Sequence, residues 1–186
     1  MNSAERDAQY IASTIRALAR RVGELERAPS LPAPGWQPIG SGSTGGLVAD
    51  FTVPVPTGYS SLRLRLSGRL SATADIAMRV NGDSGGNYQR AFTVWNADGT
   101  VNTSGSGAAT GRWTIGRWGT TSNFGGGEIL VIDGARKQMR ANLWYSGGSR
   151  SEGWGVHDGA VVSSITIVPE GGPDIDATWT LEGYRS

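Results

Sequence analysis

The sequence predicts a mostly β protein, an antiparallel jelly-roll-like β-sandwich preceded by a short N-terminal coiled-coil helix. Three observations carry this prediction. After residue 46, apolar and polar residues alternate in short segments. The 186 residues include 29 glycines, which is typical of a chain with many tight turns. Before residue 28, by contrast, apolar residues recur at steps of three and four, which is the spacing of a helix.

Residues 1–28 have the heptad pattern of a short coiled coil. The a and d positions hold Ala4, Ala8, Ile11, Ile15, Leu18, Val22 and Leu25. This stripe is narrow, as in a coiled-coil seam, and isoleucine at both an a and a d position favours three strands over two. Pro29 ends the helix because its ring cannot continue the hydrogen-bonded ladder.

Residues 21–26, RVGELE, match the Arg-h-x-x-h-Glu trimerisation motif of parallel coiled coils. Arg21 of one chain faces Glu26 of its neighbour, and its stem covers the adjacent apolar layers. We therefore predict a homotrimer with the oligomerisation residues Ala8, Ile11, Ile15, Leu18, Arg21, Val22, Leu25 and Glu26. Two alternatives stay open. In the first, the segment is a helix packed on its own domain. In the second, it is a basic arm, although four acidic residues nearly balance the charge of its five arginines.

Three regions follow from the composition. Residues 1–28 are a trimerisation and attachment segment, and residues 29–45, with Pro29, Pro32 and Pro34, are a Pro/Gly-rich linker. Residues 46–186 are the β-sandwich domain. Its nine expected strands are separated by Gly, Asn, Asp and Ser clusters without a helical pattern between them, which indicates an antiparallel sandwich. They cover residues 47–53, 62–70, 75–80, 88–95, 111–118, 127–133, 137–145, 161–169 and 177–184.

The charge and composition exclude several classes of partner. The formal net charge is +1, which gives no basic field for nucleic acid. No apolar run approaches 18 residues, so no membrane insertion is expected, and the charged first ten residues are not a secretory signal. The chain has no cysteine. We predict no cofactor.

The stretch NGDSGGNY, residues 81–88, is the most polar connection between two expected strands. Its Asn and Asp oxygens suggest a calcium loop, but Gly85 and Phe92 stand where an EF-hand loop needs oxygen ligands. The preferred interpretation is an Asx-rich turn with glycines at positive φ, and we predict no metal site.

Seven tryptophans offer aromatic faces that stack on sugar rings. The repeat GRWTIGRW places Trp113 and Trp118 on opposite faces of a regular strand, unless a bulge at Gly116 intervenes. The segment 145–159 is expected to be a flexible, glycine-rich loop. The candidate glycan-binding residues are Trp118, Tyr145, Arg150, Trp154, His157 and Asp158. Most of the seven tryptophans are expected in the core or in subunit contacts.

No enzyme is predicted, and no catalytic residue is assigned. His157 is the only histidine and lies in the glycine-rich segment, which is a poor setting for a nucleophilic triad. A glycosidase-type carboxylate pair stays open as an alternative, with Glu128, Asp133, Glu152 and Asp158 available.

Four stretches together carry a family resemblance: FTVPVPTGYSSLRLRLSGR, MRVNGDSGGNY, SSITIVPEGG and the closing TWTLEGY. In this order they resemble a β-domain in minor structural proteins of tailed bacteriophages, over about residues 47–184. The closing LEGY departs from the usual leucine-tyrosine-glycine ending of that family. The resemblance implies a virion component, a tail, baseplate or head fibre that is usually trimeric, and it supplies no catalytic residues.

The predicted function is therefore a non-enzymatic virion structural protein, a homotrimeric phage fibre, spike or minor tail protein, assembled in the host cytoplasm. Its N-terminal segment would bind other virion proteins, and its β-domain would project outward and bind host cell-surface polysaccharide. The alternatives are a capsid-attached head fibre or decoration protein, a trimeric lectin-like module, and a glycan hydrolase.

Overall fold

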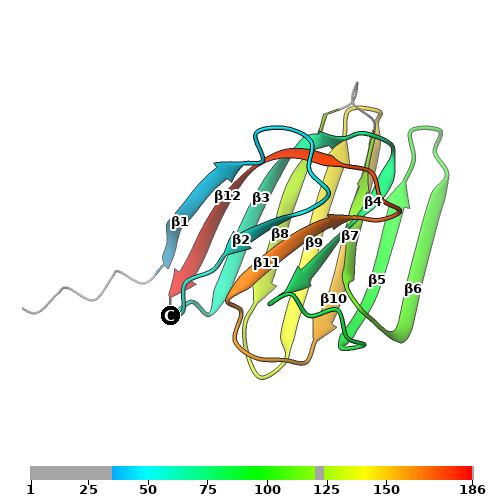
Figure 1. Cartoon of the computed structure of the whole chain (residues 1–186). Coiled ribbons are helices and arrows are strands. Elements are labelled where there is room, and N and C mark those ends of the chain that lie inside the picture. Colours follow the sequence, from blue (N-terminus) through cyan, green and yellow to red (C-terminus); the bar gives the residue numbers. More distant parts are fainter. Residues whose placement is uncertain (1–34, 120–123, 186) are drawn as a thin grey trace, which may run out of the picture. The chain divides into compact units, whose positions relative to one another are not determined.

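The computed structural model describes residues 35–119 and 124–185, apart from the side chains of residues 104–110 (Figure 1). The predicted coiled coil over residues 1–28 lies outside the described residues. Among the described residues, no helix is long and apolar enough to span a membrane. The described strands are β1 (Gly35–Ser43), β2 (Phe51–Pro54), β3 (Ser61–Leu70), β4 (Ala74–Val80), β5 (Tyr88–Trp95), β6 (Val101–Thr110), β7 (Trp113–Trp118), β8 (Gly125–Ile132), β9 (Lys137–Tyr145), β10 (Ser149–His157), β11 (Ser164–Pro169) and β12 (Ile175–Arg185).

These strands form two antiparallel sheets that pack on each other, which confirms the predicted β-sandwich. The larger sheet has the order β1-β12-β3-β8-β9-β10-β5-β6, and the smaller has the order β2-β11-β4-β7. The smaller sheet lies over the larger one in Figure 1. Strand β12 lies between β1 and β3, so the last described strand is an interior strand of its sheet.

The core lies between the two sheets, and alternate residues of β3, β9, β11 and β12 supply much of it. Strand β3 shows the rule, because Leu62, Leu64 and Leu66 are buried while Arg63 and Arg65 point away from the smaller sheet. This alternation agrees with the sequence prediction. The smaller sheet contributes large apolar side chains that are fully buried, among them Ile76, Met78, Trp113, Ile115, Ile165 and Ile167.

Strand β1 corrects the predicted linker. Residues 35–43 fall inside the range 29–45, yet they pair with β12 from Gly35 opposite Arg185 to Ser43 opposite Thr178. The edge position explains why this Pro/Gly-rich segment is a strand. An edge strand needs a hydrogen-bonding partner on one side only, so it tolerates Pro38, and its register shifts just after that residue.

Strand β10 corrects the predicted flexible loop over residues 145–159. It pairs along its whole length with β9 and β5. Its glycines make room for β7: a Cβ at Gly155 would lie 2.5 Å from the Trp113 indole nitrogen, and one at Gly153 would lie 3.1 Å from the Thr114 carbonyl oxygen. These glycines make the segment look like a loop in the sequence, but the packing of β10 against β7 requires them.

A β-bulge in β7 decides where two tryptophans lie. Ile76 pairs with Gly116 and Ala77 pairs with Thr114, so Ile115 is the extra residue. An extra residue reverses the alternation of side chains. Trp113 and Trp118 are consequently both fully buried. The prediction that Trp113 and Trp118 occupy opposite faces is therefore wrong. It holds only for a regular strand, and the bulge at Gly116 breaks that regularity.

A buried ion pair between Lys137 and Asp133 stabilises the turn between β8 and β9. The Lys137 Nζ lies 3.2 Å from Asp133 Oδ1, and the two side chains are only 1% and 9% exposed. Lys137 also donates hydrogen bonds to the carbonyl oxygens of Gly134 and Gly159. The other Asp133 oxygen accepts a hydrogen bond from the Val162 backbone N–H at 3.0 Å. The pair therefore joins this turn to the connection between β10 and β11.

Candidate functional site

The structure separates the six residues predicted to bind glycan. Arg150 and Trp154 lie on the outer face of the larger sheet, meaning the face turned away from the smaller sheet. Tyr145 is partly buried against the core, and Asp158 is exposed beyond β10, where it pairs with Arg136. The six residues do not form one site, because successive residues of a strand point to opposite faces.

Trp118 and His157 are corrections to the predicted glycan site. Both are buried, with exposed fractions of 0% and 2%, so neither offers a face to a ligand. The bulge in β7 turns Trp118 inward. His157 follows the inward alternation of β10, and its ring lies against that of Tyr88 with centroids 4.4 Å apart.

His157 has a structural role in holding the connection over residues 81–88. Its Nε2 lies 2.9 Å from Asp83 Oδ2. Asp83 also accepts hydrogen bonds from the Gly85 backbone N–H at 2.7 Å and from the Asn87 side-chain amide at 2.9 Å. Both Asp83 oxygens therefore hold the turn itself, which agrees with the Asx-turn interpretation of this stretch. Among the residues that the structure describes, no group of three or more His, Cys, Asp or Glu side chains is placed to hold a metal ion.

The same contacts make Asp83 a source of acid sensitivity. Hydrogen bonds from Asn87, then from His157 and Gly85, lower the pKa of Asp83 from 3.8 to about 2. A carboxyl group with a lowered pKa stabilises the fold above its unfolded pKa, and this stabilisation is lost as the pH falls through the folded pKa. We expect the difference in unfolding free energy between the natural chain and Asp83→Asn to shrink between about pH 4 and about pH 2. Urea denaturation at several pH values measures it, and a difference that stays constant over this window would contradict the assignment.

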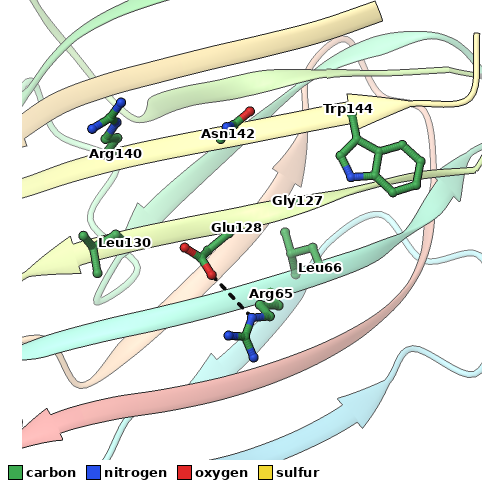
Figure 2. A pocket seen from close by; sticks show the side chains of 8 residues that line it. All are labelled: Arg65, Leu66, Gly127, Glu128, Leu130, Arg140, Asn142 and Trp144. Atoms are coloured by element: carbon green, nitrogen blue, oxygen red, sulfur yellow. Dashed lines mark hydrogen bonds and ion pairs between the residues drawn. The ribbon is translucent and has the colours of Figure 1, made fainter. Parts of the chain in front are cut away.

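A groove lies on the outer face over strands β3, β8 and β9 (Figure 2). Its volume is about 640 Å³. The residues that line it are Arg65, Leu66, Gly127, Glu128, Leu130, Arg140, Asn142 and Trp144. Arg140, Asn142 and Trp144 follow one another along β9, because alternate residues of that strand point outward. The groove is therefore a direct product of strand alternation.

Trp144 lines this groove, and a second tryptophan, Trp154, stands beside it. Trp144 is 52% exposed and Trp154 is 48% exposed. Trp144 stands opposite Gly126 of β8, and a Cβ at Gly126 would lie 3.1 Å from its indole ring. The missing side chain lets the ring lie down against the sheet. Trp154 of β10 stands directly opposite Arg140 of β9.

Four charged side chains form a network beside the groove. Arg63 and Arg65 each lie 3.3–3.4 Å from Glu128 and Glu182, so two cations share two carboxylates. Figure 2 shows the contact between Arg65 and Glu128 on the groove wall. Two smaller hollows, of about 160 and 380 Å³, also touch Arg65 and extend over β12 and β1. The concave surface thus continues from β9 across four neighbouring strands.

Arg140 and Asn142 differ from this network. Neither side chain has a hydrogen bond or an ion pair with another described residue, although both stand in the groove. Glu128 of β8 and Glu152 of β10 stand opposite Asn142, but these carboxylates are engaged by Arg65 and Arg150. The groove therefore holds polar groups that are free to bind a ligand, beside a charge network that is already satisfied.

The four carboxylates considered for glycoside hydrolysis do not all lie in the groove. Of Glu128, Asp133, Glu152 and Asp158, only Glu128 lines the groove. Each of the four lies in an ion pair, with Arg65, Lys137, Arg150 and Arg136 respectively. Glu128 and Glu152 stand on either side of Asn142 on the outer face, and each is held by an arginine.

Sequence reasoning missed Trp144, Arg140 and Asn142 as site residues. The signal was present in KQMRANLWY, where strict alternation places these three and Gln138 on one face. What the sequence alone does not supply is the neighbour of each strand, and hence the fact that Trp154 stands beside Arg140.

Comparison with known proteins adds little to this geometry. No protein-family model matches the chain, and no curated protein sequence matches it. Among solved structures, one similar chain is a variant of the alginate lyase Aly36B in complex with an alginate trisaccharide. It is 13% identical, the alignment covers 78% of this chain and 80% of that one, and the TM-score is 0.27. At that TM-score the similarity carries no argument about fold or function.

Proposed function

We propose that the β-sandwich binds a polysaccharide along the outer face of its larger sheet, in the groove between Arg65 and Trp144. One observation carries the proposal: two half-exposed tryptophans, Trp144 and Trp154, stand beside Arg140 and Asn142, whose side chains have no partner among the described residues.

The chemistry of this surface suits sugar rings. A flat indole face stacks on the C–H groups of a pyranose, and the indole brings a large apolar area at a low cost in conformational entropy. The Asn142 amide supplies both donors and an acceptor for ring hydroxyls. An open groove that continues over several strands suits an extended chain more than a compact ligand, which would favour an enclosed pocket.

The test is binding by single variants. We expect Trp144→Ala and Trp154→Ala each to weaken glycan affinity by about 10-fold or more, because each removes a stacking surface. Thermal stability should stay nearly unchanged, because both side chains are half-exposed. A glycan array identifies a bound polysaccharide, and calorimetry then gives the affinities.

The matched control is Trp36→Ala on the edge strand β1. Trp36 is also partly exposed but lines none of the hollows described above, and its ring packs against Tyr184. Equal losses for all three tryptophan variants would contradict the placement of the site, and so would unchanged binding by Trp144→Ala.

The wider part of the proposal is a non-enzymatic virion structural protein with a jelly-roll-like sandwich, a homotrimeric fibre, spike or minor tail protein that attaches through residues 1–28. Its support is the heptad pattern of that segment and the resemblance to β-domains of tailed-phage structural proteins. The alternatives are a capsid-attached decoration protein and a trimeric lectin-like module, and either would use the same groove. Light scattering on the full chain tests the trimer: a mass of three chains supports it, and a monomer contradicts it.

A further inference from the structure

We infer that the polysaccharide bound by this groove is acidic, and that Arg140 binds the carboxylate of a uronic acid unit. The inference deepens the proposed glycan function and rests on it. It starts from an imbalance of charge on the outer face of the larger sheet.

Among the described residues, five arginines of the strands point to this face, and four of them have a carboxylate partner. Arg63 and Arg65 share Glu128 and Glu182, Arg69 pairs with Asp176 at 3.1 Å, and Arg150 pairs with Glu152. Arg140 is the exception, with no ion pair among the described residues. Its position is the reason, because the residues directly opposite are Leu130 on β8 and Trp154 on β10. The strand pairing therefore leaves one guanidinium uncompensated, and it lies in the groove.

The guanidinium is well suited to one ligand chemistry. It is planar, permanently charged and presents a fork of N–H donors that matches a carboxylate in a bidentate manner. Trp154 beside it provides a face for the ring that carries the carboxylate. Along β9, Arg140 and Trp144 are four residues apart, which corresponds to about 13 Å of strand. This span exceeds one pyranose ring, so the two residues contact different units of one chain.

The neighbouring carboxylates do not oppose this assignment. Glu128 and Glu152 are the acidic residues nearest in register, and each is neutralised by its arginine. A uronic acid polymer that follows β9 therefore meets the Arg140 guanidinium, which has no ion pair within the described part of the chain, together with the Asn142 amide and the faces of Trp144 and Trp154.

The experiment compares matched polymers on the full-length protein. The probes are oligosaccharides of polygalacturonate, polyglucuronate and hyaluronan, each beside its carboxyl-reduced counterpart, which keeps the same backbone without the charge. We expect at least one acidic oligosaccharide to bind about 10-fold or more tightly than its reduced form, and Arg140→Gln to remove that preference. Arg140→Lys keeps the charge but loses the fork, so an intermediate affinity is expected.

The control variant is Arg136→Gln, which changes the net charge equally at an exposed position outside the groove. It should alter affinity by less than about 2-fold, because separated surface charges are screened at physiological salt. Equal losses for Arg136→Gln and Arg140→Gln, or equal binding of dextran sulfate, would show a general polyanion effect and overturn the inference.

Two further results separate this inference from the proposed function. If the reduced oligosaccharides bind as well as the acidic ones and Trp144→Ala abolishes both, the inference fails while the glycan function stands. If no acidic oligosaccharide binds, the inference also fails, and the neutral members of the glycan array then decide the proposed function.

Discussion

Lys137→Ala is expected to lower the free energy of unfolding by about 3–5 kcal/mol. The lysine ammonium is almost fully enclosed, and it lies against a carboxylate, Asp133, that is itself 9% exposed. Removing the ammonium leaves that carboxylate without its cation in a buried position, and it also frees the carbonyl oxygens of Gly134 and Gly159. Guanidinium chloride denaturation measures the loss.

The adjacent residue supplies the control. Arg136 pairs with Asp158 at 3.0 Å, but both side chains are more than half exposed. Exposed ion pairs contribute at most about 1 kcal/mol, so Arg136→Ala should be nearly neutral. If Lys137→Ala costs no more than Arg136→Ala, the buried pair does not fasten the turn between β8 and β9.

Trp113→Ala is expected to destabilise the sandwich by a similar amount, about 3–5 kcal/mol. The indole is fully buried, its N–H donates a hydrogen bond to the Val156 carbonyl oxygen at 3.0 Å, and its ring meets the edge of Tyr88. Alanine leaves a large cavity, and it also leaves the Val156 carbonyl without this donor.

Trp144→Ala is the matched comparison, since it deletes the same side chain from the outer face. We expect it to change the free energy of unfolding by about 0.5 kcal/mol or less, because half of the ring is already in water. Both variants are measured by the same denaturant series. A Trp113→Ala variant no less stable than Trp144→Ala would contradict the position of β7 in the core.

The comparison of these tryptophans also shows what the sequence predicts and what it does not. All nine expected strands are present, because each has apolar residues at alternate positions that reach the core. The three unexpected strands, β1, β6 and β10, are rich in glycine, serine or proline, and their pairing depends on neighbours distant in the sequence. Alternation predicts a strand only where the side chains themselves form the core.

The candidate site could be predicted only in part, because it too depends on which strands lie side by side. Trp154 and Arg150 do face outward, but from a strand rather than from the expected loop. Trp118 is buried because one extra residue in β7 reverses its direction, and a bulge of this kind is not specified by residue type alone. Arg140 is recognisable as an unpaired cation only when the residues on β8 and β10 beside it are known.

The position of β12 has a consequence for the order in which the sandwich forms. This strand joins β1 to β3, so Gly35 pairs with Arg185 across almost the whole described chain. Contacts so distant in sequence form slowly, because a long loop must close before they stabilise the chain. During synthesis β1 has no partner in the larger sheet until β12 leaves the ribosome. Folding of this sheet is therefore expected to finish after translation of residue 185, and a chain interrupted before β12 would expose the edge of β3 to aggregation.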